Sequence, residues 1–327
     1  MMLPAASLLS SVFAAGVRAR NVLYDRGSLR ARHLEGPTIS VGNLSVGGSG
    51  KTPFVILLGQ LLKARGIPFD VLSRGYGRKS RGVALVGPVG SPLDFGDEPL
   101  LIARRLGVPV VVGEDRYEAG RFAERKFGPQ FHLLDDGFQH RSLAREFEIV
   151  MVTAADARDR LLPAGRLREP LTSLQRADAV VLTAAAQASD FPVEGKMVWR
   201  APRGILPPKD VPHNPVAFCG IARPESFFVQ LRMAGIGPAA EASYGDHHHY
   251  SEADVRELLR LREQSEAGGF VTTEKDEINL GTLRSQLEPL AVVSVKMELV
   301  NSAAAIDSML AKIEERRRSR RASPVKI

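Results

Sequence analysis

The segment at residues 42–52, Gly-Asn-Leu-Ser-Val-Gly-Gly-Ser-Gly-Lys-Thr, contains the residue types that proteins use to hold a triphosphate. Its glycines let backbone N–H groups turn inward around phosphate oxygens. Lys51 can reach the β- and γ-phosphates, and the hydroxyl of Thr52 can ligate Mg²⁺. An apolar run at 38–41 predicts a strand before the segment, and a helix-like run at 53–62 follows it. This order predicts a nucleotide-binding loop, the phosphate loop, made by Ser45, Val46, Gly47, Gly48, Ser49, Gly50, Lys51 and Thr52.

The phosphate loop departs from the usual pattern G-x-x-x-x-G-K-[ST] at one position. Ser45 stands where that pattern has glycine, and Gly47 and Gly48 lie inside the loop instead. The alternative is a glycine-rich connector that binds nothing. The flanking strand and helix favour nucleotide binding, because they would place the positive end of a new helix at the phosphates.

Adjacent aspartates provide a candidate metal site. A largely apolar run at 131–134 is followed by Asp135 and Asp136. Nucleotide-hydrolysing and phosphate-transferring proteins place a carboxylate that organises Mg²⁺ at such a strand end. Neighbouring side chains in a strand point opposite ways, so the pattern leaves open which aspartate meets the metal. The alternative is a solvated Asp-Asp-Gly turn.

Arginines occur in two segments that could face an anion. Arg74 and Arg78 lie in Ser-Arg-Gly-Tyr-Gly-Arg, directly after a predicted strand at 68–72. Ligands of open parallel sheets bind at the carboxyl ends of strands, so these arginines could hold phosphates. Arg166 and Arg168 lie in Leu-Leu-Pro-Ala-Gly-Arg-Leu-Arg-Glu-Pro and suit the charge of a phosphoryl group in transfer. Surface turns with ordinary salt bridges are the alternative in both segments.

Candidate acid–base residues lie far apart in the sequence. Asp97 precedes an apparent helix at 100–106, so the residues alone favour a helix cap over a catalytic carboxylate. His247 begins a run of three consecutive histidines. Neighbours on a loop rarely converge on one tetrahedral metal ion, so we expect no zinc site there. One of these histidines, oriented by Asp246, is the more plausible acid–base group.

The order of predicted elements indicates an α/β fold with a mostly parallel sheet flanked by helices. Apolar strands at 38–41, 68–72, 108–112 and 131–135 alternate with helical segments. The region 185–215 is rich in proline and glycine, and we expect a domain boundary there. A second, smaller α/β domain is predicted beyond it, with helices near 224–234 and 252–264 and strands near 216–220, 269–272 and 291–295.

Composition and the two ends of the chain indicate anionic surroundings. The net charge is +7, and much of the excess lies in the arginine run at 316–321, which we expect to be a solvated basic tail. No nucleic-acid-binding module is recognisable, so we expect no nucleic-acid partner. Residues 3–22 have no acidic residue and have apolar residues at helical spacing. This segment is too short to span a bilayer and predicts either an interfacial amphipathic helix or a helix packed on the core.

Taken together, these segments resemble the tetraacyldisaccharide 4′-kinases of lipid A biosynthesis. The Leu-Asp-Asp-Gly-Phe-Gln-His and Thr-Thr-Glu-Lys-Asp sequences make the resemblance specific, because a phosphate loop alone is common. The matching segments follow the family's order along nearly the whole chain: 42–53, 73–78, 96–99, 134–140, 162–170, 246–248 and 272–276.

The resemblance implies an ATP- and Mg²⁺-dependent kinase that phosphorylates the 4′-hydroxyl of an acylated glucosamine disaccharide 1-phosphate. It also implies a site on the cytoplasmic face of a bacterial inner membrane, at its anionic lipid surface, and we expect a monomer. The implied fold is a P-loop domain and a smaller α/β domain joined by a two-stranded linker. The expected divisions are an amphipathic helix at 1–25, the kinase domain at 26–200, the smaller domain at 201–298, and a returning helix with basic tail at 299–327.

Site roles follow from the resemblance residue by residue. Lys51 and Thr52 would act on phosphates and Mg²⁺, with Asp136 and Asp135 on the metal side. Asp97 would be the catalytic base, paired with His247, which reverses the preference for a helix cap. Further residues are expected near phosphates or the disaccharide: Arg74, Tyr76, Gln139, His140, Arg168, Glu169 and Asp246.

Two competing functions remain at this point. A nucleotide switch that controls a protein partner would also need the phosphate loop and the aspartates, but not a lipid-facing amino terminus. No guanine-specifying Asn-Lys-x-Asp segment is obvious. A soluble small-molecule kinase is the second alternative, and dependence of activity on detergent would discriminate against it.

Overall fold

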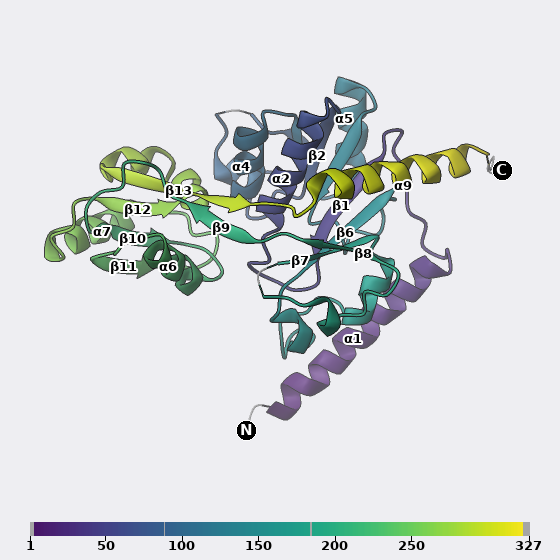
Figure 1. Cartoon of the computed structure of the whole chain (residues 1–327), viewed down its shortest axis with the longest axis horizontal. Helices are drawn as coiled ribbons and strands as arrows, with labels where there is room; N and C mark the ends of the chain where they lie inside the picture. The colour runs from purple at the N-terminus through teal and green to yellow at the C-terminus, as the bar shows by residue number, and fades with distance from the viewer. Residues whose placement is uncertain (1–2, 88, 184, 323–327) are drawn as a thin grey trace.

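The computed structural model describes residues 3–87, 89–183 and 185–322, and it contains two β-sheets side by side along the long axis of the molecule (Figure 1). The larger sheet has eight strands in the order β3-β4-β2-β5-β1-β6-β7-β8. All its neighbours pair in parallel except β3 with β4. Its strands are β1 (Thr38–Asn43), β2 (Phe69–Ser73), β3 (Ala84–Leu85), β4 (Val110–Val112), β5 (Phe131–Asp135), β6 (Phe147–Val152), β7 (Ala179–Leu182) and β8 (Met197–Arg200).

Helices cover both faces of this sheet, which explains why its central strands are buried apolar runs. On one face, α2 (Lys51–Ala64), α4 (Asp97–Leu106) and α9 (Ser302–Ala322) contribute to a single apolar core. On the other face, α5 (Arg116–Phe127) packs Ala119 and Ala123 against Leu72 and Leu134. Shorter helical segments are α3 (Pro92–Phe95) and 3₁₀ turns at Asp156–Arg158, Leu171–Arg176 and Ala188–Asp190.

The smaller sheet has five strands in the order β11-β10-β12-β13-β9. It consists of β9 (Arg203–Leu206), β10 (Val216–Cys219), β11 (Ala240–Ser243), β12 (Phe270–Thr273) and β13 (Leu290–Met297). Its helices are α6 (Pro224–Met233), α7 (Glu252–Gln264) and α8 (Glu274–Leu280), followed by a 3₁₀ turn at Gly281–Gln286. We refer to the parts built on the two sheets as the larger and the smaller lobe.

Antiparallel strands β9 and β13 carry the chain into the smaller lobe and back out of it (Figure 1). Residues 201–202 separate β8 of the larger sheet from β9 of the smaller one. After β13, helix α9 returns to the larger sheet and buries Ile306, Met309 and Ile313 in its core. The α/β fold with two sheets and a two-stranded connection is therefore confirmed.

Most predicted elements are present, and their bounds shift by few residues. The helix predicted near 252–264 coincides with α7. Strands β3 and β11 and helix α8 were not predicted, because they are short and have no apolar periodicity of their own.

The arginine run at 316–321 was expected to be a solvated basic tail, and it is largely exposed, but it is helical and two of its arginines pair with the larger lobe. Helix α9 continues to Ala322. Arg316 donates to Asp178 at 2.7 and 2.8 Å, and Arg320 donates to Glu146 at 2.8 Å. These arginines are one helical turn apart, so they lie on one face and anchor the helix to the larger lobe.

Helix α1 (Leu3–Asp25) lies along the outside of the larger lobe, with its amino-terminal end pointing away from it (Figure 1). Ser10 Oγ donates to the carbonyl of Leu161 at 3.0 Å, and Asp25 pairs with Arg141 at 2.7 Å. Within the described residues, no helix is both long enough and apolar enough to cross a bilayer.

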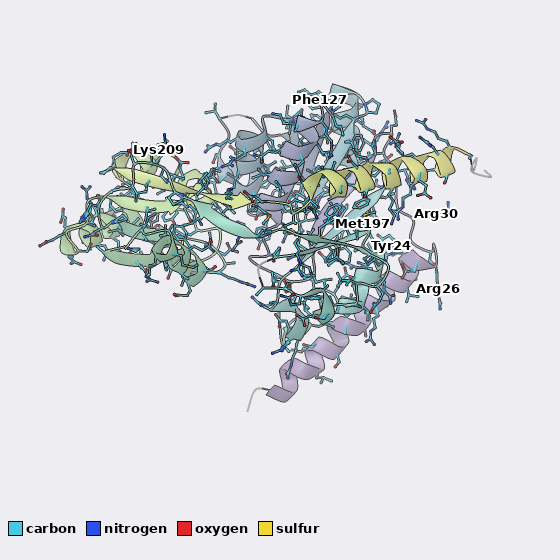
Figure 2. The ribbon with its side chains drawn as sticks, in the orientation of Figure 1. Tyr24, Arg26, Arg30, Phe127, Met197 and Lys209 are labelled. Carbon is cyan, nitrogen blue, oxygen red and sulfur yellow. The ribbon has the colours of Figure 1, made fainter. Side chains whose placement is uncertain are left out.

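The outer side of α1 is apolar and the turn after it is basic. Leu8, Leu9 and Val12 are 69%, 57% and 65% exposed. Arg26 and Arg30 project from the turn that follows the helix (Figure 2). The exposed apolar side chains therefore lie near the amino-terminal end of α1, and the exposed arginines follow its carboxyl-terminal end.

Candidate active site

A cleft of about 780 Å³ separates the two lobes. The larger lobe contributes the phosphate loop and the ends of β2 and β5, which point their carboxyl ends at the same edge of the sheet. The smaller lobe contributes residues 221–223, 246–247 and 273–275. The cleft therefore collects side chains from both sheets.

The phosphate loop connects β1 to α2 as predicted. Gly47, Gly48 and Gly50 have φ angles of 79°, 51° and 86°, a region in which side chains other than glycine are strained. Asn43 fixes the loop, because its Nδ2 donates to the Ser45 carbonyl at 2.7 Å and to Ser49 Oγ at 2.8 Å. Its Oδ1 accepts from Lys51 Nζ at 3.2 Å. Sequence reasoning did not single out Asn43, which lies at the end of an apolar strand and matches no position of the motif.

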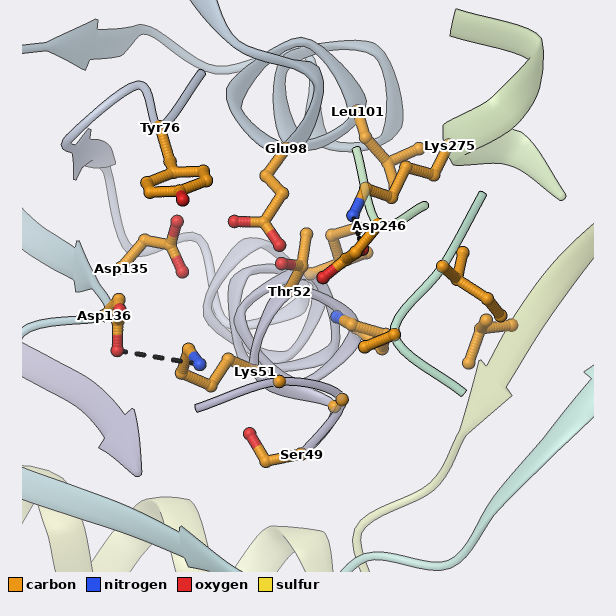
Figure 3. Close-up of a pocket in the computed structure, with 18 of the residues that line it drawn as sticks. Ser49, Lys51, Thr52, Tyr76, Glu98, Leu101, Asp135, Asp136, Asp246 and Lys275 are labelled. Carbon is orange, nitrogen blue, oxygen red and sulfur yellow. Dashed lines mark hydrogen bonds and ion pairs between the residues drawn. The ribbon is translucent and has the colours of Figure 1, made fainter. Parts of the chain in front are cut away.

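Asp136 is held by two cations of the larger lobe. Arg168 donates to its two carboxylate oxygens at 2.8 and 2.9 Å, and Lys51 Nζ lies 3.6 Å from Oδ1 (Figure 3). Burial opposes ionisation, but the charge of Lys51 and the hydrogen bonds from Arg168 hold the pKa of Asp136 well below its usual range. Arg168 also contacts the side chain of Asn43. The partners of Arg168 are thus Asp136 and Asn43, which lie beside the phosphate loop.

Asp135, the neighbour of Asp136, has a different environment. It is 2% exposed, and its Oδ2 accepts from Ser73 Oγ at 3.0 Å. Its Oδ1 is buried without a hydrogen-bond partner among the described residues. Burial, and then the negative charges of Glu98 and Asp136, raise the pKa of Asp135 to about 7. An unpaired carboxylate oxygen beside the phosphate loop is suited to meeting a cation.

Asp97 pairs with His247 across the cleft. Nδ1 of His247 lies 2.9 and 3.0 Å from the two oxygens of Asp97. Gly96 occupies the N-cap position of α4, and Asp97 is the first residue of the helix, so the alternative of Asp97 as the helix cap is wrong. His247 has φ 60°, a strained backbone of the kind that marks functional positions.

Further residues of the smaller lobe surround this pair. Asn279 donates to Asp97 Oδ2 at 3.1 Å, and Lys275 Nζ lies 3.7 Å from the same atom. Burial raises the pKa of Asp97, but the hydrogen bond from His247 and the charge of Lys275 outweigh burial and lower this pKa to about 2. Burial lowers the pKa of His247, but Asp97 outweighs this effect, so the pKa of the imidazole is raised. The pair is thus an ionised carboxylate beside an imidazole that holds its proton more firmly than usual.

Asp246 has a different partner from the one that the sequence suggested. It pairs with Lys275 at 2.9 Å and lies 3.8 Å from His247 Nε2 (Figure 3). Asp97, not Asp246, therefore orients His247. The next histidine, His248, has a separate partner and pairs with Asp254 at 3.1 Å.

Other predicted site residues also line the cleft, namely Arg74, Tyr76, Gln139 and His140. Tyr76 is 63% exposed, and its ring centroid lies 5.2 Å from that of His247. Gln139 Nε2 donates to the Asn43 carbonyl at 3.0 Å. Burial, and then the charges of Arg116 and Arg145, lower the pKa of His140 to about 4, so its imidazole is neutral at neutral pH.

Glu169 lies elsewhere, which corrects the expectation that it is near the cleft. It is fully buried under α1, where it accepts from Asn21 at 2.8 Å and from Arg20 at 3.4 Å. Arg176 also pairs with it at 3.0 Å. Glu169 therefore attaches α1 to the larger lobe, while its neighbour Arg168 faces the cleft.

The structure adds residues to the cleft that the sequence did not indicate. The carboxylates of Glu98 and Asp135 point into the same space beside Thr52 (Figure 3). In the sequence, only its position next to Asp97 could have indicated that Glu98 lines the cleft. Arginines 116, 203 and 223 also line the cleft, but they lie in segments without a recognisable motif.

A phosphate loop on one lobe, in a cleft with a histidine of the other lobe that pairs with a buried aspartate of the first, is typical of a nucleotide-dependent phosphate-transferring protein. A family model described as tetraacyldisaccharide-1-P 4′-kinase matches residues 3–314. The chain belongs to this family.

Individual relatives agree with this assignment. The chain is 52% identical over 317 residues to a tetraacyldisaccharide 4′-kinase from Koribacter versatilis, which covers 94% of this chain and 98% of the relative. A relative of the same name from Aquifex aeolicus is 41% identical over 285 residues, covering 81% of this chain and 85% of the relative. The solved "apo" form of LpxK from Aquifex aeolicus in complex with ATP is similar with a TM-score of 0.77 and 36% identity, covering 95% and 98% of the two chains.

Proposed function

We propose that this chain is an ATP-dependent kinase that phosphorylates the 4′-hydroxyl of a tetraacyldisaccharide 1-phosphate, a precursor of lipid A. The observation that carries the proposal is the phosphate loop facing the Asp97–His247 pair across one cleft. Family membership favours this function over a nucleotide switch, because the relatives are named as kinases of this substrate.

The larger lobe holds the nucleotide in this proposal. Backbone N–H groups of residues 45–50 surround the β- and γ-phosphates, and Lys51 balances their charge. Asp136 positions Lys51 and Arg168, since it pairs with both of them. Phosphate transfer needs positioning and charge balance more than covalent chemistry, so this rigid set is central to the reaction.

Thr52 and an acidic residue of the cleft would hold Mg²⁺. Within the described part of the chain, no three His, Cys, Asp or Glu residues gather closely enough to hold a metal unaided. Mg²⁺ usually binds to one or two carboxylates together with substrate phosphates, so the set fits it. We assign Asp135 to the metal rather than Asp136, because an oxygen of Asp135 is unpaired and both oxygens of Asp136 are engaged. The metal would balance the charge of the phosphates.

The Asp97–His247 pair takes the proton of the 4′-hydroxyl. As that oxygen bonds to the γ-phosphorus, the bond from phosphorus to the β,γ-bridging oxygen breaks and ADP leaves. Asp97 is 3% exposed and has a pKa of about 2, so it is a weak base in this arrangement. His247 has the better matched pKa, and Asp97 orients it and stabilises its charged form.

The remaining cleft residues would contact the disaccharide and its 1-phosphate. Arg74 is exposed at the end of β2, and Tyr76 offers an apolar ring beside His247. Asp246, Gln139 and His140 supply hydrogen-bonding groups around the same space. We assign these residues to substrate contacts because they line the same cleft as His247.

We also propose that α1 docks on the cytoplasmic face of the inner membrane, where an acylated substrate resides. Its exposed Leu8, Leu9 and Val12 would enter the interface, and the exposed Arg26 and Arg30 after the helix would contact anionic lipids. The chain would act as a monomer. Its domains would divide at 1–25, 26–200, 201–298 and 299–327, and closure of the 201–298 domain would exclude water from the transfer.

The test is transfer of labelled γ-phosphate from ATP to the tetraacylated disaccharide 1-phosphate in mixed micelles. We expect a labelled lipid product whose formation requires ATP, Mg²⁺ and detergent. ATP hydrolysis that is stimulated by a protein and yields no labelled lipid would contradict the proposal.

A further inference from the structure

The phosphate loop is covered by a loop of the smaller lobe. A Cβ placed on Gly47 would lie 3.4 Å from the Cβ of Ala222, and one placed on Gly48 would lie 3.4 Å from Nε of Arg223. Ala222 and Arg223 belong to the turn between β10 and α6. The side chain of Arg223 therefore crosses the gap between the lobes and lies against the residues that face a bound triphosphate.

Arg223 has no partner for its charge within the described residues. Its Nη2 is buried and makes no hydrogen bond. Most buried polar groups are paired, so an orphaned guanidinium nitrogen calls for an explanation. Arg168 shows the contrast, because its guanidinium forms a fork on Asp136.

A second arginine lies close by and adds to the positive charge. Burial, and then the charge of Arg223, lower the pKa of Arg203. Nη1 of Arg203 would lie 3.8 Å from a Cβ on Gly50, so it too faces the phosphate loop. Like charges side by side are unfavourable unless an anion lies between them. The loop beneath them is built to hold such an anion.

We propose that Arg223 is an arginine finger that the smaller lobe places on the β- and γ-phosphates of the nucleotide. The inference rests on the proposed function and assigns one of its residues. During transfer, negative charge moves onto the oxygen that bridges the β- and γ-phosphates as its bond to the γ-phosphorus breaks. A planar guanidinium can donate two hydrogen bonds to these oxygens. Arg223 thus couples approach of the smaller lobe to the chemistry on the larger one.

The test compares Arg223→Ala and Arg223→Lys with Arg232→Ala. Arg232 lies at the other end of α6, is exposed and pairs with Glu241, so its loss controls for surface charge. We measure kcat, the KM values for ATP and for the disaccharide, and the affinity for ADP alone and for ADP with aluminium fluoride. The fluoride complex imitates the phosphoryl group in transfer and needs no disaccharide.

We expect Arg223→Ala to lower kcat by about 10³-fold, the smaller end of the effect of arginine fingers. Affinity for ADP with aluminium fluoride should fall by a similar factor, and ADP affinity should stay within about threefold, which also shows that the loop is folded. Arg223→Lys should recover part of the loss, because lysine provides charge without the fork. Arg232→Ala should match the unmodified chain.

Three results would overturn the inference: unchanged kcat in Arg223→Ala, equal losses of affinity for ADP and for its fluoride complex, or a raised KM for the disaccharide alone. The last result would assign Arg223 to the substrate's 1-phosphate. If the unmodified chain transfers no phosphate to the disaccharide, the proposed function fails. The fluoride measurement then still decides whether Arg223 senses the transferred phosphoryl group.

Discussion

Asp97 and Asp135 are both buried, Asp97 behind the cleft residue His247 and Asp135 in the cleft lining, yet their pKa values move in opposite directions. The pKa of Asp97 is lowered to about 2, and that of Asp135 is raised to about 7. Burial favours the neutral form of both carboxyls, so the difference comes from their partners. Asp97 has His247 and Lys275 beside it, whereas Asp135 has the negative charges of Glu98 and Asp136.

The partners also differ in which lobe provides them. His247, Lys275 and Asn279 reach Asp97 from the smaller lobe. The carboxyl of Asp135 accepts instead from Ser73 of the larger lobe, and its other oxygen has no partner among the described residues. The chemistry of Asp97 therefore depends on the lobes being together, and that of Asp135 does not. Carboxyls whose environments move their pKa values apart are typical of sites with divided roles.

The largest expected effect comes from Asp97→Asn, which removes the charge that orients His247. We expect kcat to fall by about 10²–10⁴-fold, the usual contribution of a general base and its support. KM for ATP should stay within about threefold, because Asp97 does not form part of the phosphate loop. Steady-state kinetics with the labelled-phosphate assay measure both quantities.

Asp94→Asn is the matched control, since Asp94 is exposed one helix earlier. It should behave as the unmodified chain. Near-normal turnover in Asp97→Asn would show that the contact between the lobes at this residue is only structural.

The next effect concerns the pH dependence of turnover. His247 must be neutral to accept a proton, and its pKa is raised by Asp97. The logarithm of kcat should therefore rise with pH through this raised pKa and level off above it. In Asp97→Asn the support of the carboxylate is lost, so the rise should move to lower pH.

His247→Gln should lack this rise, because no group titrates at that position. His248→Gln provides a neighbouring control, because His248 pairs with Asp254 and does not line the cleft. An unchanged rise in His247→Gln would assign the titration to another group and reject His247 as the proton acceptor.

Local sequence predicted the larger-lobe half of the site well. The phosphate loop lies in consecutive residues, and its glycines, Lys51 and Thr52 have fixed positions relative to one another. The pairing of Asp97 with His247 spans 150 residues and was available only from the family resemblance. No spacing rule connects residues on different lobes, and for the same reason Arg223 and Lys275 were missed.

Ion pairs between residues that lie far apart in the sequence were likewise not predicted. Arg316 and Arg320 were expected in a solvated tail, but they meet Asp178 and Glu146, which lie 138 and 174 residues earlier. Glu169 was expected near the cleft because it follows Arg168. The two side chains point in different directions, Arg168 toward Asp136 and Glu169 toward Asn21 of α1. Strands and helices follow from periodicity, whereas such contacts follow from how the elements pack.

A smaller effect is expected from Asp135→Asn, which tests the other half of the comparison. Loss of a carboxylate near the metal should raise the Mg²⁺ concentration for half-maximal activity by about 10–100-fold, the range for groups that support a metal. Turnover at saturating Mg²⁺ should recover most of its value, unlike in Asp97→Asn. Titration of activity with Mg²⁺ measures this, with Asp94→Asn again as the control. An unchanged Mg²⁺ requirement would exclude Asp135 from the metal.

The smallest effect is expected from Ser73→Ala, which removes the hydrogen bond to Asp135. Ser73 stabilises the ionised carboxylate, so its loss should lower the free energy of unfolding by about 1 kcal/mol where Asp135 is charged. Because the folded pKa of Asp135 is raised to about 7, the difference should be largest above that pH and shrink below it. Urea unfolding without Mg²⁺ measures the difference, and Ser308→Ala on the exposed side of α9 is the control. A difference that is independent of pH would mean that Ser73 stabilises the fold without acting on the charge of Asp135.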